Sequence, residues 1–174
     1  MRIRIILMAA LIFGSMWPGQ GNAGADSETC ADAQVPPQTR IDACTRLVLS
    51  QMWEGNDLAA IFHNRGQAYY NQGRFDWAIR DFDLAIDLAP ENARLFIDRG
   101  SAYDDKGQFQ RAIRSYDRAI ALDPAHALAY INRGWAYEKL GENEQALRDY
   151  RKAHALGNRL QWLIDRLELF GETQ

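Results

Sequence analysis

The segment ARLFIDRGSAYDDKGQFQRAIRSYDRAIALDPAH, residues 93–126, decides the fold of this chain because its pattern occurs three times. The stretches 59–92 and 127–158 align with it without a gap, which gives the chain an internal period of 34 residues. Each unit has a large ring at its fourth position, glycine at its eighth and tyrosine at its eleventh: Phe62, Gly66 and Tyr69; Phe96, Gly100 and Tyr103; Tyr130, Gly134 and Tyr137. A fixed period of roughly 20 to 50 residues indicates a repeat architecture.

Each unit is predicted to form two amphipathic helices. In its first half, the spacing i, i+4 and i+7 places the ring, the glycine and the tyrosine on one helical face. The second half repeats this spacing with small, aromatic and small residues: Ala78, Phe82 and Ala85; Ala112, Tyr116 and Ala119; Ala146, Tyr150 and Ala153. Small residues let the partner helix approach closely while the rings fill the remaining volume. Glycine between the two helices, as at Gly107, is expected to end the first one.

These units resemble tetratricopeptide repeats, and the resemblance covers residues 59–158. It implies an all-α fold, an α-solenoid whose first helices line a concave face. The predicted parts are a signal peptide (1–25), an N-terminal segment with a half-repeat helix (26–58), three repeats (59–92, 93–126 and 127–158) and a C-terminal capping helix (159–174). Terminal units are expected to be atypical because the end of a solenoid would otherwise expose an apolar face.

The N-terminus is typical of an export signal. Arg2 and Arg4 precede an apolar run over 5–13, and small residues place a cleavage site after Ala25, with a cut after Ala23 or an uncleaved anchor as alternatives. The segment ACTR, residues 43–46, and a cysteine upstream of it also resemble short exported bacterial tetratricopeptide proteins. We therefore expect a periplasmic or secreted protein.

Cys30 and Cys44 are the two cysteines of the chain and are expected to form a disulfide in an oxidising compartment. A redox or metal role is the rival interpretation, but the spacing is not C-x-x-C and no histidine is near.

The sequence shows no set of residues with the spacing of a catalytic site. A net charge of −3 without a Lys/Arg-rich block argues against nucleic acid as a partner. His63, His126 and His154 occupy different positions of different units, so no metal site is predicted. Acidic pairs such as Asp104 and Asp105 have no evident base or metal ligand beside them. We expect no enzyme activity and no cofactor.

Arginine recurs at the seventh position of each unit and aspartate at the twenty-third. Arg65 and Arg133 are expected to pair with Asp81 and Asp149 in their own units. Ser115 replaces the aspartate in the second unit, so its arginine is the exception.

The predicted function is a scaffold that binds a protein or peptide in the groove. The resemblance places the groove residues as an apolar strip beside three acids: Tyr70, Ile97, Ile131 and Trp135; Asp104, Asp105 and Glu138. A partner segment with apolar anchors and a basic residue matches them. Trp135 has an alternative role, packing between neighbouring helices. The Lys, Asn and Arg with which some relatives grip a C-terminal carboxylate are replaced by His63, Gln67, Asp98, Leu128 and Asn132, which disfavours chaperone tails.

A second function remains open. The terminal helix carries Trp162 and offers a surface for self-assembly or an accessory role in the cell envelope instead of a ligand groove.

Overall fold

The computed structural model describes residues 23–171 of the chain, and every regular element within this range is an α-helix. The helices are α1 (Ala23–Ala31), α2 (Pro37–Ser50), α3 (Gly55–Asn71), α4 (Phe75–Leu88), α5 (Ala93–Asp105), α6 (Phe109–Leu122), α7 (Ala127–Lys139), α8 (Asn143–Ala155) and α9 (Gln161–Gly171). Most of the predicted signal peptide lies outside the described residues. None of the described helices is long and apolar enough to cross a bilayer.

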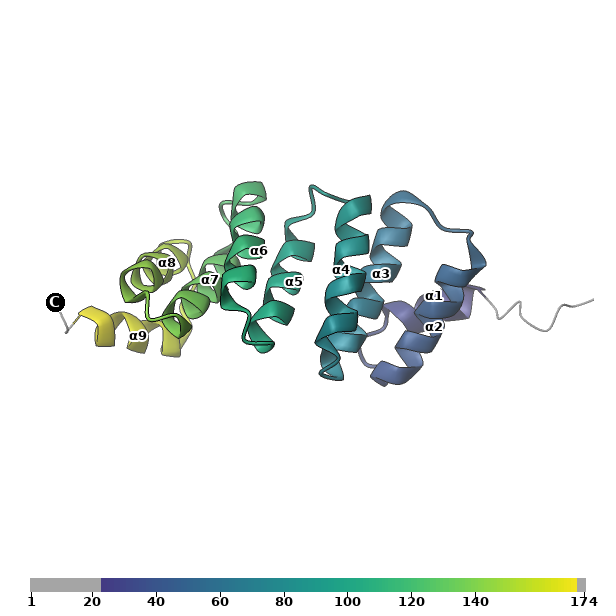
Figure 1. Ribbon diagram of the computed structural model, residues 1–174, viewed down its shortest axis with the longest axis horizontal. Helices are drawn as coiled ribbons and strands as arrows, with labels where there is room; N and C mark the ends of the chain where they lie inside the picture. The colour runs from purple at the N-terminus through teal and green to yellow at the C-terminus, as the bar shows by residue number, and fades with distance from the viewer. Residues whose placement is uncertain (1–22, 172–174) are drawn as a thin grey trace, which may run out of the picture.

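The helices pair into hairpins that follow one another along the long axis of the molecule (Figure 1). The pairs α3/α4, α5/α6 and α7/α8 correspond to the three units of the sequence. The all-α solenoid expected from the 34-residue period is confirmed.

In each of the three repeats, a glycine of the first helix packs directly against an aromatic ring of the second helix. A Cβ atom added to Gly66 would lie 2.7 Å from the ring of Phe82, and one added to Gly134 would lie 2.7 Å from the ring of Tyr150. Both distances are below van der Waals contact, so only glycine allows this approach. Gly107, between α5 and α6, has φ +72°, the left-handed conformation expected at a helix end.

The N-terminal segment forms a hairpin of two helices, so the structure adds the helix α1 to the helix expected for a half-repeat. The helix α2 begins at Pro37, because Pro36 is extended at φ −51° and ψ 138° and Pro37 occupies the first turn. The additional helix α1 packs against α2, and a disulfide joins Cys30 to Cys44 across them, with the Cα atoms 5.0 Å apart. The predicted cleavage after Ala25 falls within α1 and would leave its Asp26, which pairs with Arg46 on α2.

The C-terminal helix α9 packs against α8. It starts 34 residues after the start of α7, so it takes the place of the first helix of a further repeat. Leu163 is fully buried in the core of the third repeat, whereas Leu160 and Trp162 are exposed. The predicted cap therefore buries one face and leaves some apolar surface uncovered.

Candidate peptide-binding groove

The first helices α3, α5 and α7 are joined by side-chain contacts along one face of the solenoid. His63 and Gln67 of α3 reach Asp98 of α5, and Asn132 of α7 reaches Ser101 of α5. In both cases a residue at the fifth or ninth position of one unit contacts the residue at the sixth position of the next unit.

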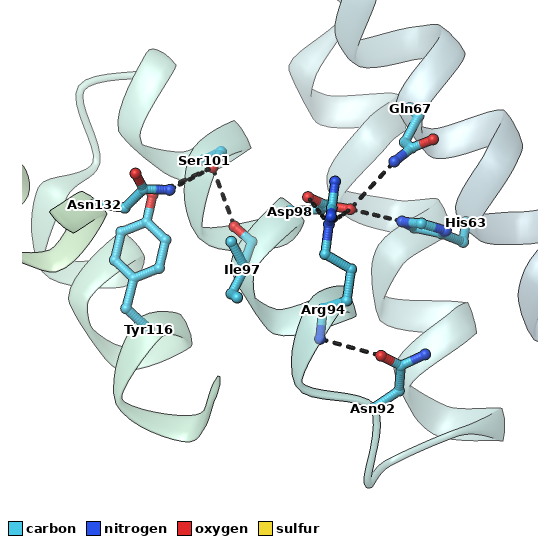
Figure 2. A network of polar contacts seen from close by, with 9 residues as sticks. All are labelled: His63, Gln67, Asn92, Arg94, Ile97, Asp98, Ser101, Tyr116 and Asn132. Atoms are coloured by element: carbon cyan, nitrogen blue, oxygen red, sulfur yellow. Dashed lines mark hydrogen bonds and ion pairs between the residues drawn. The ribbon is translucent and has the colours of Figure 1, made fainter. Parts of the chain in front are cut away.

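Asp98 is the centre of this network (Figure 2). Its carboxylate lies 2.6 Å from Nε2 of His63, accepts from Nε of Arg94 at 3.0 Å, and is 3.4 Å from the amide of Gln67. Burial by itself would raise the pKa of Asp98, but the hydrogen bond with His63 and the charge of Arg94 outweigh burial and hold that pKa below its ordinary value. Asp98 is therefore an ionised, saturated acceptor at neutral pH.

Trp135 lies on the same face of α7. It stands at the ninth position of its unit, as do Gln67 and Ser101. Trp135 is 37% exposed, and Nζ of Lys139 lies 4.2 Å from the centroid of its ring. An exposed indole beside a cation, on a face that is otherwise polar, offers an apolar contact to a ligand.

Two predicted groove residues are not at the surface, which corrects the predicted apolar strip. Ile97 is 1% exposed and Ile131 is 5% exposed. Ile97 packs in a core cluster with Ala129 and Ala136 of α7, and Ile131 packs with Leu163 of α9. The fifth position faces the seam between adjacent first helices, so an apolar side chain there is covered by the next unit.

The three predicted acids lie at the C-terminal half of α5 and α7 and are partly paired. Tyr70 donates to Asp105, Tyr116 donates to Asp104 at 3.5 Å, and Tyr150 donates to Glu138 at 2.9 Å. Glu138 also pairs with Arg166 of α9 at 3.1 Å, a contact that the repeat pattern did not predict.

Asp104 has an unusual environment among these acids. Its Oδ1 atom is buried and has no hydrogen-bond partner within the described part of the chain. Burial and the neighbouring charge of Asp105 raise the pKa of Asp104 to about 6. A carboxyl group in this state is sensitive to the charge of anything that binds next to it.

A cavity of about 300 Å³ opens on this face between α2, α3 and α5. Gln67, Tyr70, Arg94 and Asp98 line it, and so does Arg40 of α2. The sequence pattern did not indicate Arg40, because this residue precedes the repeats and has no equivalent in them.

Within residues 23–171, no group of three or more His, Cys, Asp or Glu side chains is arranged to hold a metal ion.

A row of helical hairpins with a shared polar face along its first helices defines a helical-repeat protein. A sequence profile described as tetratricopeptide repeat matches residues 59–92 and 127–156, and one described as TPR repeat matches residues 100–141. The chain therefore belongs to the tetratricopeptide repeat family. No curated protein sequence matches it.

Solved structures of other proteins share the fold. The first TPR of Spaghetti (RPAP3), bound to the HSP90 peptide SRMEEVD, is 27% identical with a TM-score of 0.65, over 70% of this chain and 97% of that one. The second TPR domain of human RPAP3, in complex with the HSP70 peptide SGPTIEEVD, is 25% identical with a TM-score of 0.63, over 67% and 98% of the two chains. MamA is 26% identical with a TM-score of 0.64, over 69% and 68%.

Proposed function

We propose that this protein is a non-catalytic scaffold that binds an extended segment of a partner protein along α3, α5 and α7. The observation that carries the proposal is the exposed ring of Trp135 on the face where the first helices meet. Exposed aromatic side chains in the centre of a binding surface supply much of the binding energy in protein interfaces. The peptides bound to the RPAP3 domains support the same use of this fold.

The chemistry of the groove specifies the bound segment. An apolar side chain of the partner would contact Trp135, and a basic residue would lie near Asp104 and Asp105 at the C-terminal end of α5. The Lys, Asn and Arg set of the carboxylate-gripping relatives is replaced on this face, and one of the replacing residues, Asp98, is an acid that binds His63 and Arg94. Chaperone tails therefore remain disfavoured partners.

We place this binding in the bacterial periplasm. The export signal expected over residues 1–25 and the bonded pair Cys30 and Cys44 support that location.

The experiment is photo-crosslinking in periplasmic extract. A benzophenone amino acid replaces Trp135 in one variant and Trp77 in a matched control, because Trp77 is also an exposed tryptophan (49%) but lies on α4, a second helix. Mass spectrometry then identifies the adducts. We expect one dominant partner from position 135 and none in common from position 77. The same adducts from both positions would contradict groove binding.

A second function, self-assembly, is favoured by the uncovered apolar residues of the C-terminal end. Trp162 is 38% exposed and lies edge-on to Tyr150, and Leu160 and Leu169 at the same end of the chain are also exposed. Light scattering separates the two functions. A dimer that Trp162→Asp converts to a monomer would support assembly, whereas a monomeric wild-type protein would leave the groove as the functional surface.

A further inference from the structure

Arg40 is a buried cation that forms no ion pair within the part of the chain that the structure describes. Its side chain is 2% exposed, and its one hydrogen bond within residues 23–171 runs from Nε to the carbonyl oxygen of Cys30, at 3.3 Å. No carboxylate of the described chain forms an ion pair with it, whereas Arg65 and Arg133, which are also largely buried, each pair with an aspartate. A guanidinium has five donors, so most of the donors of Arg40 remain unused.

The unused donors adjoin the groove cavity. Arg40 lines the cavity of about 300 Å³ together with Gln67 and Asn71 of α3 and Arg94 and Asp98 of α5 (Figure 2 shows Gln67, Arg94 and Asp98). Arg94 and Asp98 pair with each other, so Arg40 provides the uncompensated charge of this lining. The amides of Gln67 and Asn71 are neutral groups that can add hydrogen bonds.

Keeping such a cation inside the protein is unfavourable. Burial lowers the pKa of Arg40, and the charge of Asp32 offsets only part of this effect. A buried charge that lacks a partner is among the most destabilising features of a protein interior, and it is tolerated where a ligand supplies the partner. The cavity next to Arg40 has room for such a ligand.

We propose that Arg40 is the anchor of an anion subsite in the groove and that this subsite takes a carboxylate of the bound polypeptide. A planar guanidinium matches a carboxylate with two parallel hydrogen bonds. A dianion such as phosphate is a poorer ligand here, because one uncompensated positive charge faces it and the carboxylate of Asp98 lies in the same lining. The inference extends the proposed function: the partner segment carries an acidic group near α2 in addition to its contact with Trp135.

The N-terminal hairpin sets the position of this anchor. The carbonyl oxygen that holds Nε of Arg40 belongs to Cys30, and the disulfide ties Cys30 to Cys44 on the same helix as Arg40. The hairpin that precedes the repeats therefore acts as a wall of the groove as well as an end cap.

The first test examines the anion site without a partner. The Nε–Hε signals of the arginines are followed by NMR while sodium acetate replaces sodium chloride at constant ionic strength. We expect the signal that disappears in Arg40→Met to shift and saturate with acetate. A shift no larger than that of the exposed Arg148 would overturn the proposal.

The second test measures peptide preference. Twelve-residue peptide pools, blocked at both ends, carry either Glu or Gln at a central position, and a third pool carries Gln with a free C-terminus. We expect a pool with a carboxylate to bind at least fivefold tighter than the blocked Gln pool, and Arg40→Met to abolish that difference. The third pool distinguishes a terminal carboxylate from one on a side chain. If all pools bind equally well, the groove function stands and the carboxylate subsite is refuted. If acetate binds at Arg40 but no peptide pool binds, only the groove function is refuted.

The stability of the variant separates an anchor from a structural residue. Methionine has about the same volume as the arginine stem and no charge, so Arg40→Met is expected to melt at the same temperature as wild type or higher. Arg40→Lys keeps the charge but not the planar fork, and is expected to retain only part of the carboxylate preference. A variant Arg40→Met that melts lower and still prefers the carboxylate pool would assign Arg40 to the fold and overturn the proposal.

Discussion

Arg99 of the second repeat forms its ion pair with Asp83 of the first repeat, at 2.7 Å between Nη1 and Oδ1. Within its own repeat it donates a hydrogen bond to the hydroxyl of Ser115, at 3.2 Å, and its guanidinium lies over the ring of Phe96. The equivalent residues Arg65 and Arg133 each bind both oxygens of an aspartate in their own hairpin. Arg133 also pairs with Asp117 of the preceding repeat, at 2.6 Å. Arg99 therefore keeps the ion pair between repeats and lacks the ion pair within its own hairpin.

Restoring the missing aspartate tests this arrangement. Ser115 is 1% exposed and stands where the other repeats have Asp81 and Asp149. We expect Ser115→Asp to change the free energy of unfolding by less than about 1 kcal/mol, because Arg99 is present to pair with it. In an Arg99→Met background the same change buries an unpaired carboxylate and is expected to cost about 3 kcal/mol or more.

Urea unfolding of the four proteins gives the coupling energy between Ser115→Asp and Arg99→Met. A cost of Ser115→Asp that is the same in both backgrounds would contradict the pairing of Arg99 with this position.

The close approach of Gly100 to Tyr116 makes a second prediction. The ring of Tyr116 occupies the space that a Cβ atom of residue 100 would need, so Gly100→Ala is expected to destabilise the protein by roughly 1–3 kcal/mol despite the better helix propensity of alanine. Thermal melting followed by circular dichroism measures the effect. In a Tyr116→Leu background Gly100→Ala should cost less, and an equal cost in both backgrounds would mean that the ring is not the cause.

The repeats were predictable from the sequence because their packing is local and periodic. Glycine, ring and small residue recur at fixed offsets, and each offset has one structural meaning. The hairpin before the repeats was only half predicted, since α1 carries no such pattern and is held by the disulfide and by α2.

The site was predicted less completely than the fold. Trp135 lies at the surface as expected, but Ile97 and Ile131 are buried, because whether the fifth position faces the groove or the seam depends on the spacing of neighbouring units. The contact of Arg166 with Glu138 depends on where α9 packs, and the burial of Arg40 depends on the fold of the N-terminal hairpin. Neither follows from the period.

The raised pKa of Asp104 leads to a pH-dependent prediction. Between pH of about 4 and about 6 the folded protein keeps a proton on Asp104 that the unfolded chain has released, so this residue makes stability fall as pH rises through that window. Asp104→Asn removes the effect. We expect the variant to gain melting temperature relative to wild type between pH 4 and pH 7. A difference between the two proteins that stays constant with pH would refute the assignment.

The disulfide makes a prediction about the N-terminal hairpin. Cys30 and Cys44 are both buried, and their bond closes a loop of 15 residues, which in the chain-entropy model stabilises the fold by about 3 kcal/mol. Exported protein should show no free thiol after denaturation, and Cys44→Ala should lower the melting temperature by several degrees. The double variant Cys30→Ala, Cys44→Ala should melt close to the single variant, because both lose the same bond. Titratable thiols in unreduced exported protein would contradict the prediction.

The groove makes its sharpest prediction at Trp135. Truncation to alanine removes the exposed ring on the face shared by α3, α5 and α7, and leaves the core rings in place. If the partner packs on this ring, Trp135→Ala should weaken its binding by about 2 kcal/mol or more, as the loss of an aromatic hot spot does. The helical signal and the melting temperature should change little, because Trp135 is more than one third exposed and belongs to none of the core clusters of the described residues. Trp77→Ala removes an exposed ring of the same kind from α4 and should leave binding unchanged. Calorimetry with the partner identified by crosslinking measures both variants. An unaltered affinity of Trp135→Ala would remove Trp135 from the binding surface, and a collapse of its melting temperature would show that the ring serves helix packing instead.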